Sequence, residues 1–598
     1  MHAAIRSIHC NNYDQILKAG TISSSPAPRR RNSHLNPTLA CDLISSPNSK
    51  TSANARPIAG MALHIAPMQA LLNKRLSRTI LFASLILLSL IFAGYYSASP
   101  NLYDNARDRL PTWLTPPSPA GGDEKLPETP ATSGDEPDIY PHETTSQFFP
   151  VALDASTARK ADLCASFPRY LLQRIQPVLK MGHGESRDKI EAQLDSVSAC
   201  FTPDELLIFS DLAETIREHK VIDIIADLPE SYRGADNPDF EGYLTMQAMR
   251  ANGTLDGDKE AMKKINGWKL DKYKFLPGVE RAWNMRPGMD WYVFYETDTY
   301  ISWDNLFRFL NTMDPGKEHY IGSPSPGRFD ERKKIKTWFA NGGPGYILSR
   351  AVVEKLLERK VSKTTGRYID PPLTIRWLDL LRRDCCGDSV MGWTLWNVNI
   401  HVEGYWPLFN PHPMHGVPYS EHYWCQPVVT LHKTRPEDME PLWKWEHSRR
   451  RRDKPLLYQD LWSFRHPGDE PTVLVKDHDN GGWADYRPPP EGPKIDSVAS
   501  CQKACEASDR CLQYLWRGLE AQECFLMFQV RYGLPRKPET EKVWGEEKQP
   551  DGSMKKVVLR EIKVDFTSGW MSERIKRWRD ERTCEVVQWV GPSITRIF

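Results

Sequence analysis

The sequence has almost no excess of charge of either sign, and no two of its cysteines are spaced as Cys-x-x-Cys. Its 598 residues include 78 Lys and Arg against 77 Asp and Glu. Because the charges balance, there is no electrostatic reason to expect a nucleic acid partner. The 12 cysteines are even in number, and ten of them lie from Cys164 onward. Without the close pairs of a zinc site, they favour disulfides formed in an oxidising compartment.

One uncharged hydrophobic run, Thr79 to Tyr96, is long enough to span a bilayer. It begins too far into the chain for an ordinary signal peptide. A buried core helix is the alternative, but the flanks are loop-like and the run is apolar on all sides. Basic residues precede it, so we expect a cytosolic N-terminus and a lumenal remainder that carries the glycosylation sequon at Asn252. Because the span is short, we expect the thinner membranes of the Golgi or the ER–Golgi route.

The length exceeds that of one compact domain, and composition divides the chain into segments. We expect a disordered tail (1–78), the membrane helix (79–96), a Pro/Ser/Thr-rich stem (97–152), an α/β domain (153–446), a basic linker (447–464) and a smaller domain (465–598). In residues 153–446 strands alternate with helices, which is typical of a layered α/β fold. The four Arg of the linker, Arg449 to Arg452, could bind an anion, but no aromatic or Gly residues interleave with them, so a solvated linker is favoured.

The hydrophobic run from Trp291 to Tyr295 ends in the triplet Glu296-Thr297-Asp298. Its dense aromatic and β-branched residues predict a buried central strand. Strand residues at i and i+2 share a face, so Glu296 and Asp298 could approach one metal ion. Hard oxygen ligands favour Mg²⁺ or Mn²⁺. The alternative is a strand that simply ends at a polar turn.

Three further segments contain candidate site residues. The glycines of 342–345 allow a sharp turn and a close approach of the backbone to a ligand, or only an ordinary turn before a helix. Asp388, in a loop with two cysteines, could be a general base or a helix N-cap, for which Ser389 is the other candidate. His432, near the end of the hydrophobic segment 427–433, could complete a metal site or be structural.

In this order the four segments resemble the Fringe-like glycosyltransferases of family 31, which include the core 1 β-1,3-galactosyltransferases, here in a fungal-type form. The matching pieces are Glu296 to Tyr300, Gly342 to Ser349, Asp388 four residues before Gly392, and His432. The resemblance covers about residues 155–440. It implies a GT-A fold, a Rossmann-like domain for a nucleotide sugar.

The resemblance also implies the chemistry. We expect a UDP-sugar donor, Mn²⁺ or Mg²⁺, and an inverting transfer that forms a β-1,3 linkage to a glycan or glycoprotein, with galactose favoured. It gives metal binding to Asp298 and His432 and the role of base to Asp388. The residues expected at the donor are Ser210, Asp211, Lys272, Thr297, Gly342, Gly343 and Gly345. The family usually has Asp at the first position of the triplet, so the longer Glu296 is expected to bind the metal directly or through water, or to contact the donor.

The C-terminal domain resembles the PAN/Apple module, a disulfide-stapled α+β unit that binds proteins or carbohydrates. The resemblance implies the pairs Cys501–Cys524 and Cys505–Cys511. The run Asp477-His478-Asp479 could be a metal cluster, but a turn before the following glycines is favoured.

The leading hypothesis is therefore a single-pass type II membrane glycosyltransferase with a lumenal catalytic domain. A catalytically inactive relative that acts as a lectin or chaperone through the Apple-like module is the second, because Glu296 departs from the family. A membrane-tethered adhesion protein is the third. The sequence does not fix the oligomeric state.

Overall fold

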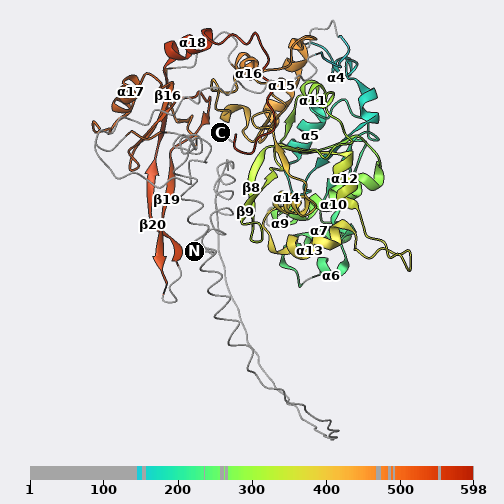
Figure 1. The fold of residues 1–598 in the computed structure, drawn as a ribbon. Coiled ribbons are helices and arrows are strands. Elements are labelled where there is room, and N and C mark those ends of the chain that lie inside the picture. Colours follow the sequence, from blue (N-terminus) through green and yellow to red (C-terminus); the bar gives the residue numbers. More distant parts are fainter. Residues whose placement is uncertain are drawn as a thin grey trace, which may run out of the picture. The chain divides into compact units, whose positions relative to one another are not determined.

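The described part of the chain is built around one eight-stranded sheet with helices on both faces (Figure 1). The computed structural model describes residues 145–596 except 151–156, 235, 256–261, 263–264, 266, 466–472, 483–485, 489–491 and 550–553. In sheet order the strands are β11 (Val402–Gly404), β7 (Tyr320–Gly322), β10 (Tyr346–Ser349), β5 (Trp291–Glu296), β1 (Ile175–Lys180), β2 (Leu207–Ser210), β4 (His219–Asp223) and β3 (Glu214–Ile216). The predicted mixed α/β class is confirmed.

Strand β1 is the place where the strand order reverses. It pairs in parallel with β2 on one side and with β5 on the other. In open α/β sheets, ligands bind outside the carboxyl ends of the strands beside such a switch point. The sheet order therefore directs attention to the ends of β1, β2 and β5.

The helices divide between the two faces of the sheet. One face carries α4 (Lys160–Cys164), α5 (Arg187–Asp195), α11 (Trp303–Leu310), α15 (Pro436–Arg449) and α16 (Tyr458–Arg465). The other carries α7 (Glu241–Ala251), α9 (Gly267–Asp271), α10 (Phe275–Met285), α12 (Arg350–Leu357), α13 (Leu373–Arg383) and α14 (Gly387–Asn397). The short helix α6 spans Glu230–Arg233.

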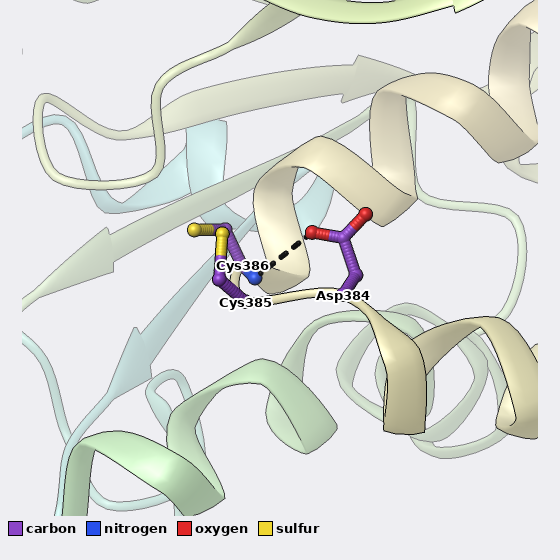
Figure 2. A group of neighbouring side chains, drawn as sticks. All are labelled: Asp384, Cys385 and Cys386. Carbon is purple, nitrogen blue, oxygen red and sulfur yellow. Dashed lines mark hydrogen bonds between the residues drawn. The ribbon is translucent and has the colours of Figure 1, made fainter. Parts of the chain in front are cut away.

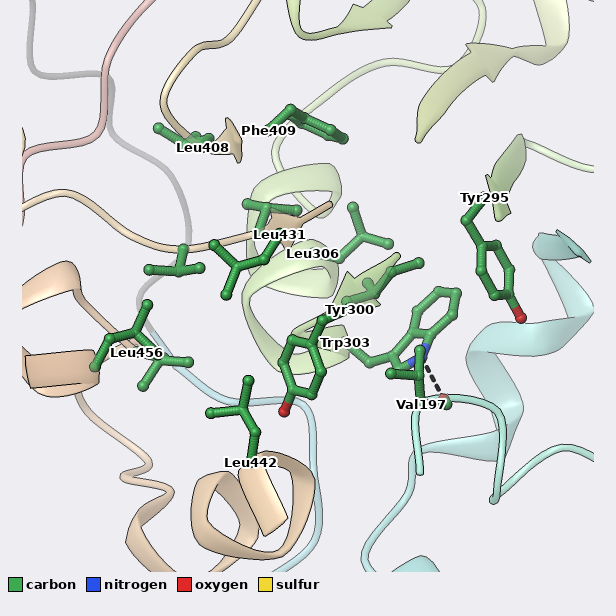
Figure 3. Close-up of a cluster of buried hydrophobic side chains, with 14 of the residues drawn as sticks. Val197, Tyr295, Tyr300, Trp303, Leu306, Leu408, Phe409, Leu431, Leu442 and Leu456 are labelled. Atoms are coloured by element: carbon green, nitrogen blue, oxygen red, sulfur yellow. Dashed lines mark hydrogen bonds between the residues drawn. The ribbon is translucent and has the colours of Figure 1, made fainter. Parts of the chain in front are cut away.

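Strand β5 separates the two hydrophobic cores of the sheet. Trp291, Val293 and Tyr295 face what we call the α11-side core, and Tyr292 and Phe294 face the α10-side core. Successive side chains of a strand point to opposite faces, so a sheet covered on both faces needs an uninterrupted apolar strand. This explains the sequence of β5 and confirms the predicted strand. Figure 3 shows the α11-side core, where the indole of Trp303 donates a 2.8 Å hydrogen bond to the carbonyl of Val197.

Two smaller strand groups lie beside the large sheet. One is the three-stranded group of β12 (Phe409–Asn410), β13 (Thr430–Leu431) and β6 (Tyr300–Ile301), and the other is the hairpin of β8 (Pro324–Asp330) and β9 (Ile335–Ala340). Leu431 pairs with Tyr300. This pairing brings the next residue, His432, beside the segment that follows β5.

The C-terminal part contains a four-stranded sheet and the helix α17 (Val498–Glu506). In sheet order the strands are β14 (Leu474–Lys476), β21 (Phe566–Trp570), β16 (Gln513–Arg517) and β17 (Glu523–Met527). The remaining elements are β15 (His478–Asp479), β18 (Leu534–Pro535), the hairpin β19 (Glu539–Lys548) with β20 (Met554–Val564), and α18 (Ser572–Asp580). Both expected disulfides, Cys501–Cys524 and Cys505–Cys511, are present. Two others join Cys164 to Cys200 and Cys425 to Cys584.

The segment 447–464 is not the solvated linker that its arginines predict. It contains the end of α15 and the start of α16, and it buries Leu456 and Leu457. The side chain of Arg450 is only 12% exposed and lies 3.9 Å from Glu446. Arg449 pairs with Asp460 at 2.8 Å and is also partly buried, whereas Arg451 and Arg452 are exposed.

The C-terminal part shares the α11-side core with the α/β domain. Trp570, Ile575 and Trp589 belong to that core, and the Cys425–Cys584 disulfide crosses the expected boundary. These contacts make one continuous unit of the two regions.

Part of the expected stem packs against the α/β domain. Phe148, inside the expected stem, is buried and its ring contacts Phe167 and Phe307. The tail 1–78, the membrane segment Thr79–Tyr96 and most of the stem lie outside the described residues. Within the described ranges, no helix has the length and apolar character needed to cross a bilayer.

Candidate functional site

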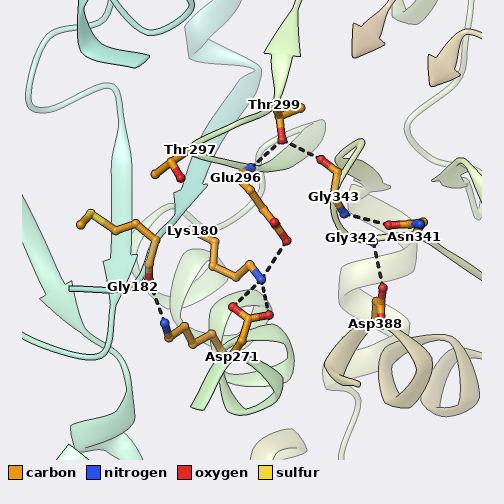
Figure 4. A network of polar contacts seen from close by, with 12 residues as sticks. Lys180, Gly182, Asp271, Glu296, Thr297, Thr299, Asn341, Gly342, Gly343 and Asp388 are labelled. Carbon is orange, nitrogen blue, oxygen red and sulfur yellow. Dashed lines mark hydrogen bonds and ion pairs between the residues drawn. The ribbon is translucent and has the colours of Figure 1, made fainter. Parts of the chain in front are cut away.

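The site is formed at the carboxyl ends of β1, β2 and β5. These parallel strands end at Lys180, Ser210 and Glu296 on the same edge of the sheet. Strand β10 is antiparallel to β5 and begins at this edge, so the turn Gly342–Gly345 before it faces the same way. Figure 4 shows the polar side chains that meet here. Lys180, Asp271 and Glu296 place charged groups at this edge.

The expected metal ligands come together. Glu296, Asp298 and His432 each place a ligand atom within 4.8 Å of the others. The Nε2 atom of His432 lies 3.5 Å from Oδ1 of Asp298, too far for a good hydrogen bond. That carboxylate oxygen is buried and has no hydrogen-bond partner. Burial lowers the pKa of His432 despite the carboxylates nearby, so the neutral imidazole offers a lone pair. Two carboxylates and an imidazole fit a hard divalent cation.

Gly343 makes room for the imidazole. A Cβ atom at this position would lie 2.1 Å from the ring of His432. Its carbonyl accepts a 2.7 Å hydrogen bond from the hydroxyl of Thr299, just after the acid triplet. The glycine turn is therefore a contact surface of the site, and any side chain here would displace His432.

Two lysines that the sequence analysis did not identify balance the carboxylates. Lys180 lies 2.9 Å from Glu296 and 2.6 Å from Asp271 (Figure 4). Burial would lower the pKa of Lys180, but these carboxylates raise it above its ordinary value. Lys189 of α5 lies 3.2 Å from Asp298. One signal in the sequence could have identified Lys180. The apolar run of β1 ends in this lysine, as the apolar run of β5 ends in Glu296.

Asp388 lies across the glycine turn from Glu296 (Figure 4). Its Oδ2 accepts a 3.0 Å hydrogen bond from the N–H of Gly342, and its Oδ1 a 2.8 Å bond from the N–H of Ser389. Neither Asp388 nor Ser389 is the N-cap of α14, because that position belongs to Cys386. Burial raises the pKa of Asp388 to about 6. A carboxylate with a pKa near neutral pH suits general base catalysis.

The residues expected at the donor fall into two groups. Ser210 and Asp211 are buried at the end of β2, where Asp211 forms a 2.9 Å ion pair with Lys274. Thr297 lies in the site and donates a 2.6 Å hydrogen bond to Glu185. Lys180, Lys274, Glu296 and Gly342 line a narrow pocket.

Lys272 does not join this group. Its ammonium forms a 2.8 Å ion pair with Asp239 and donates to the carbonyls of Arg382 and Asp384. These contacts are structural, since the residue lies in a 3₁₀ turn that faces the end of α13, and its contact with the donor stays a prediction. It anchors the loop that precedes Asp388.

The expected N-glycosylation site is accessible to solvent. Asn252 is exposed at the end of α7, and Thr254 of the sequon is exposed as well. A glycan attached there would meet solvent.

Comparison with known proteins identifies one segment of this site. Residues 269–380 match the Fringe-like family model. Fringe glycosyltransferase of Drosophila melanogaster is 32% identical over 83 residues, 12% of this chain and 20% of that protein. The β-1,3-N-acetylglucosaminyltransferase lunatic fringe of Mus musculus is 25% identical over 136 residues, 20% of this chain and 36% of that protein. The radical fringe enzyme of Gallus gallus is 28% identical over 82 residues, which cover 12% of this chain and 22% of the enzyme.

The matched segment runs from α9 to α13 and includes the acid triplet and the glycine turn, but it ends before Asp388 and His432. The chain spans about a fifth to a third of the length of these relatives. The chain therefore carries a Fringe-like domain over residues 269–380.

Proposed function

We propose that the chain is a metal-dependent, inverting glycosyltransferase that moves a hexose from a UDP-sugar to a glycan or glycoprotein and forms a β-1,3 linkage. The observation that carries the proposal is the buried Oδ1 of Asp298, which has no hydrogen-bond partner and lies 3.5 Å from Nε2 of His432. The Fringe-like segment supports the same reaction class, since the relatives named above are glycosyltransferases. Galactose is the donor sugar we favour.

Asp298 and His432 would hold Mn²⁺ or Mg²⁺. Glu296 would bind through the oxygen that does not contact Lys180, or through water. When bound, the ion supplies charge stabilisation for the departing diphosphate. The chain adds its own positive charge through Lys189, whose ammonium already lies at Asp298.

Asp388 would take the proton from the acceptor hydroxyl as that oxygen attacks the anomeric carbon. Its pKa of about 6 leaves it ionised at neutral pH. The N–H of Gly342 orients the carboxylate, and the attack from the side opposite the leaving diphosphate inverts the anomeric configuration. The glycine turn thus connects the metal ligand His432, through Gly343, with the base, through Gly342.

The membrane anchor at 79–96, the lumenal orientation and the Golgi location belong to the same proposal. The four disulfides and the exposed Asn252 are consistent with an oxidising lumen. We assign the helix and sheet around Cys501–Cys524 to a PAN/Apple-like module that binds the acceptor. Its attachment to the α11-side core would hold a bound glycoprotein at a fixed position relative to the catalytic edge.

The experiment is a donor screen with the purified full chain. UDP-galactose, UDP-glucose and UDP-N-acetylglucosamine are each incubated with and without Mn²⁺, and released UDP is measured. We expect release of UDP from one donor that depends on Mn²⁺ and is lost in Asp298→Asn. Glu318→Gln, which removes a surface carboxylate paired with Lys355, is the matched control. No release from any donor at any metal concentration would exclude the enzyme.

One observation favours a second function. The pairs Lys180–Glu296 and Lys189–Asp298 already neutralise the carboxylates without an ion. This arrangement would suit an inactive relative that binds glycans as a lectin or chaperone. Binding of UDP without turnover in the same screen would favour it.

A further inference from the structure

Two adjacent cysteines lie directly before the proposed base. Cys385 and Cys386 precede Gly387 and Asp388 at the start of α14. Their sulfur atoms and a carboxylate oxygen of Asp384 all lie within 4.8 Å of one another (Figure 2). The thiol of Cys386 is hydrogen-bonded to Cys385, and this bond raises its pKa. The other described cysteines are all in disulfides, so this pair differs from its surroundings.

We propose that Cys385 and Cys386 are a redox modification site that closes to a disulfide between neighbouring residues. The oxidant is a disulfide of the same compartment, either a small molecule or a protein. The thiolate of one cysteine attacks this disulfide, forms a mixed disulfide and releases one thiol. The second cysteine then attacks the bonded cysteine sulfur and releases the other thiol. Two protein thiols are oxidised, one disulfide is reduced, and the two protons pass to the departing thiolates.

The disulfide formed in this way is easy to reduce. Neighbouring Cα atoms are about 3.8 Å apart across a trans peptide bond. Ordinary disulfides have Cα atoms roughly 4.4–6.8 Å apart, and departures from this range store strain that makes the bond more reducible. Both cysteines are partly exposed, so a small disulfide can reach them. The pair therefore responds to the redox state while the four ordinary disulfides persist.

The modification is coupled to Asp388 because the backbone on both sides of the pair is held. Asp384 forms an ion pair with Arg328, and its carbonyl accepts a 3.0 Å hydrogen bond from Lys272. On the other side, Gly387 packs closely against Phe275, because a Cβ atom at Gly387 would lie 2.3 Å from that ring.

Ring closure must therefore turn the peptide at Cys386 itself. The N–H of Cys386 now donates a 3.2 Å hydrogen bond to the Asp384 carboxylate, and Cys386 caps the helix that carries the base. Turning that peptide disturbs the 3.0 Å bond between Asp388 and Gly342. The consequence for catalysis rests on the proposed function: the dithiol form transfers sugar, and the disulfide form binds donor but transfers slowly.

The first test detects the disulfide between Cys385 and Cys386 without an activity assay. The purified full chain is equilibrated with different ratios of oxidised to reduced glutathione and is then alkylated and digested. The mass of the peptide that contains residues 384–388 is measured by mass spectrometry. We expect the oxidised form to lack two hydrogens and to resist alkylation, while Cys164–Cys200 and Cys425–Cys584 stay intact at every ratio used. Alkylation of both cysteines at all ratios, or only a stable glutathione adduct, would overturn the proposal. Cys385→Ser and Cys386→Ser must each abolish the two-hydrogen loss.

The second test measures whether formation of the disulfide changes the rate of sugar transfer. Transfer of sugar by the oxidised chain should fall at least tenfold, with unchanged UDP binding, and a thiol should restore it. Cys385→Ser should keep one rate at every glutathione ratio, and a ratio-dependent rate in that variant would overturn the coupling. If the disulfide forms but no condition gives any transfer, the modification site stands and the proposed function fails. If it forms and transfer is unchanged, the link to Asp388 is wrong.

Discussion

The backbone N–H of Gly342 donates a 3.0 Å hydrogen bond to Oδ2 of Asp388, and so joins a turn before β10 to the first turn of α14. The two residues belong to segments that the sequence keeps 46 positions apart. Because Gly343, the next residue, contacts His432, one short turn positions both the proposed base and a proposed metal ligand. Most of the expected outcomes below depend on this arrangement.

Asp388→Asn should bind the donor with ordinary affinity and transfer sugar at least about 100-fold more slowly, because an amide cannot accept the proton of the acceptor. Asn can still accept the hydrogen bond from Gly342 but not also the one from Ser389, so the fold should be retained with one backbone hydrogen bond fewer. UDP binding by calorimetry and transfer by product analysis separate the two effects. Loss of UDP binding would place Asp388 at the donor instead.

The pH dependence of transfer should report the same group. Since burial raises the pKa of Asp388 to about 6, transfer should be constant near pH 8 and fall tenfold per pH unit below about pH 6. A rate that stays constant down to pH 4.5 would mean that no group with this pKa is required.

The stability of Asp388→Asn relative to the unchanged chain should rise as the pH rises from 4 to 7.5. The folded-state pKa of about 6 exceeds the unfolded value of about 3.9, so the stability contributed by the protonated group is present below pH 4 and lost as the pH rises through 6. Two pKa units correspond to about 3 kcal/mol. The stability difference between the two proteins, measured by denaturant unfolding, should therefore shift in favour of the variant by about this amount between pH 4 and pH 7.5. A stability difference that is the same at both pH values would indicate an effect of packing and not of charge.

Gly343→Ala should weaken metal binding, because the new methyl group occupies the position of the His432 ring. We expect at least a tenfold higher Mn²⁺ concentration for half-maximal activity. Gly267→Ala is the matched control, since nothing lies within 4 Å of the Cβ at that position. Equal metal requirements in the two variants would remove His432 from the site.

Replacing Cys425 and Cys584 with Ser should destabilise the chain more than replacing Cys505 and Cys511. The first disulfide spans 159 positions and the second spans 6. In the chain-entropy model these spans correspond to about 5 and about 2 kcal/mol. Unfolding in denaturant compares the pairs, and a larger loss from the short loop would contradict the expectation.

Local patterns predicted β5 well, since an aromatic and β-branched strand buried on both faces leaves an uninterrupted apolar run. The resemblance to the Fringe-like family, and not strand geometry, grouped Asp298, His432 and Asp388 into one expected site. Local patterns did not predict the ion pairs that Lys180 and Lys189 form with the acid triplet, because these partners lie more than 100 positions away and are brought together by sheet order. The contacts of Lys272 were not predicted for the same reason, because its partners lie on α13 and beside α7.

The basic linker was wrong although a local signal existed. Glu446 and Arg450 are four positions apart, the spacing of an ion pair on a helix, and this could have extended α15 into the arginine run. The shared core had no such signal, because Trp589 is an isolated aromatic residue in the sequence and only the fold places it against α11.

The ring of Phe309 stacks on Trp589 at 6.2 Å between centroids. Phe309 belongs to the helix that follows the acid triplet, so the packing of this segment near the middle of the chain depends on a residue that the ribosome adds much later. The nascent Fringe-like segment therefore keeps part of its core uncovered until Trp589 has been synthesised, and a chain that stops before Trp589 exposes this apolar surface.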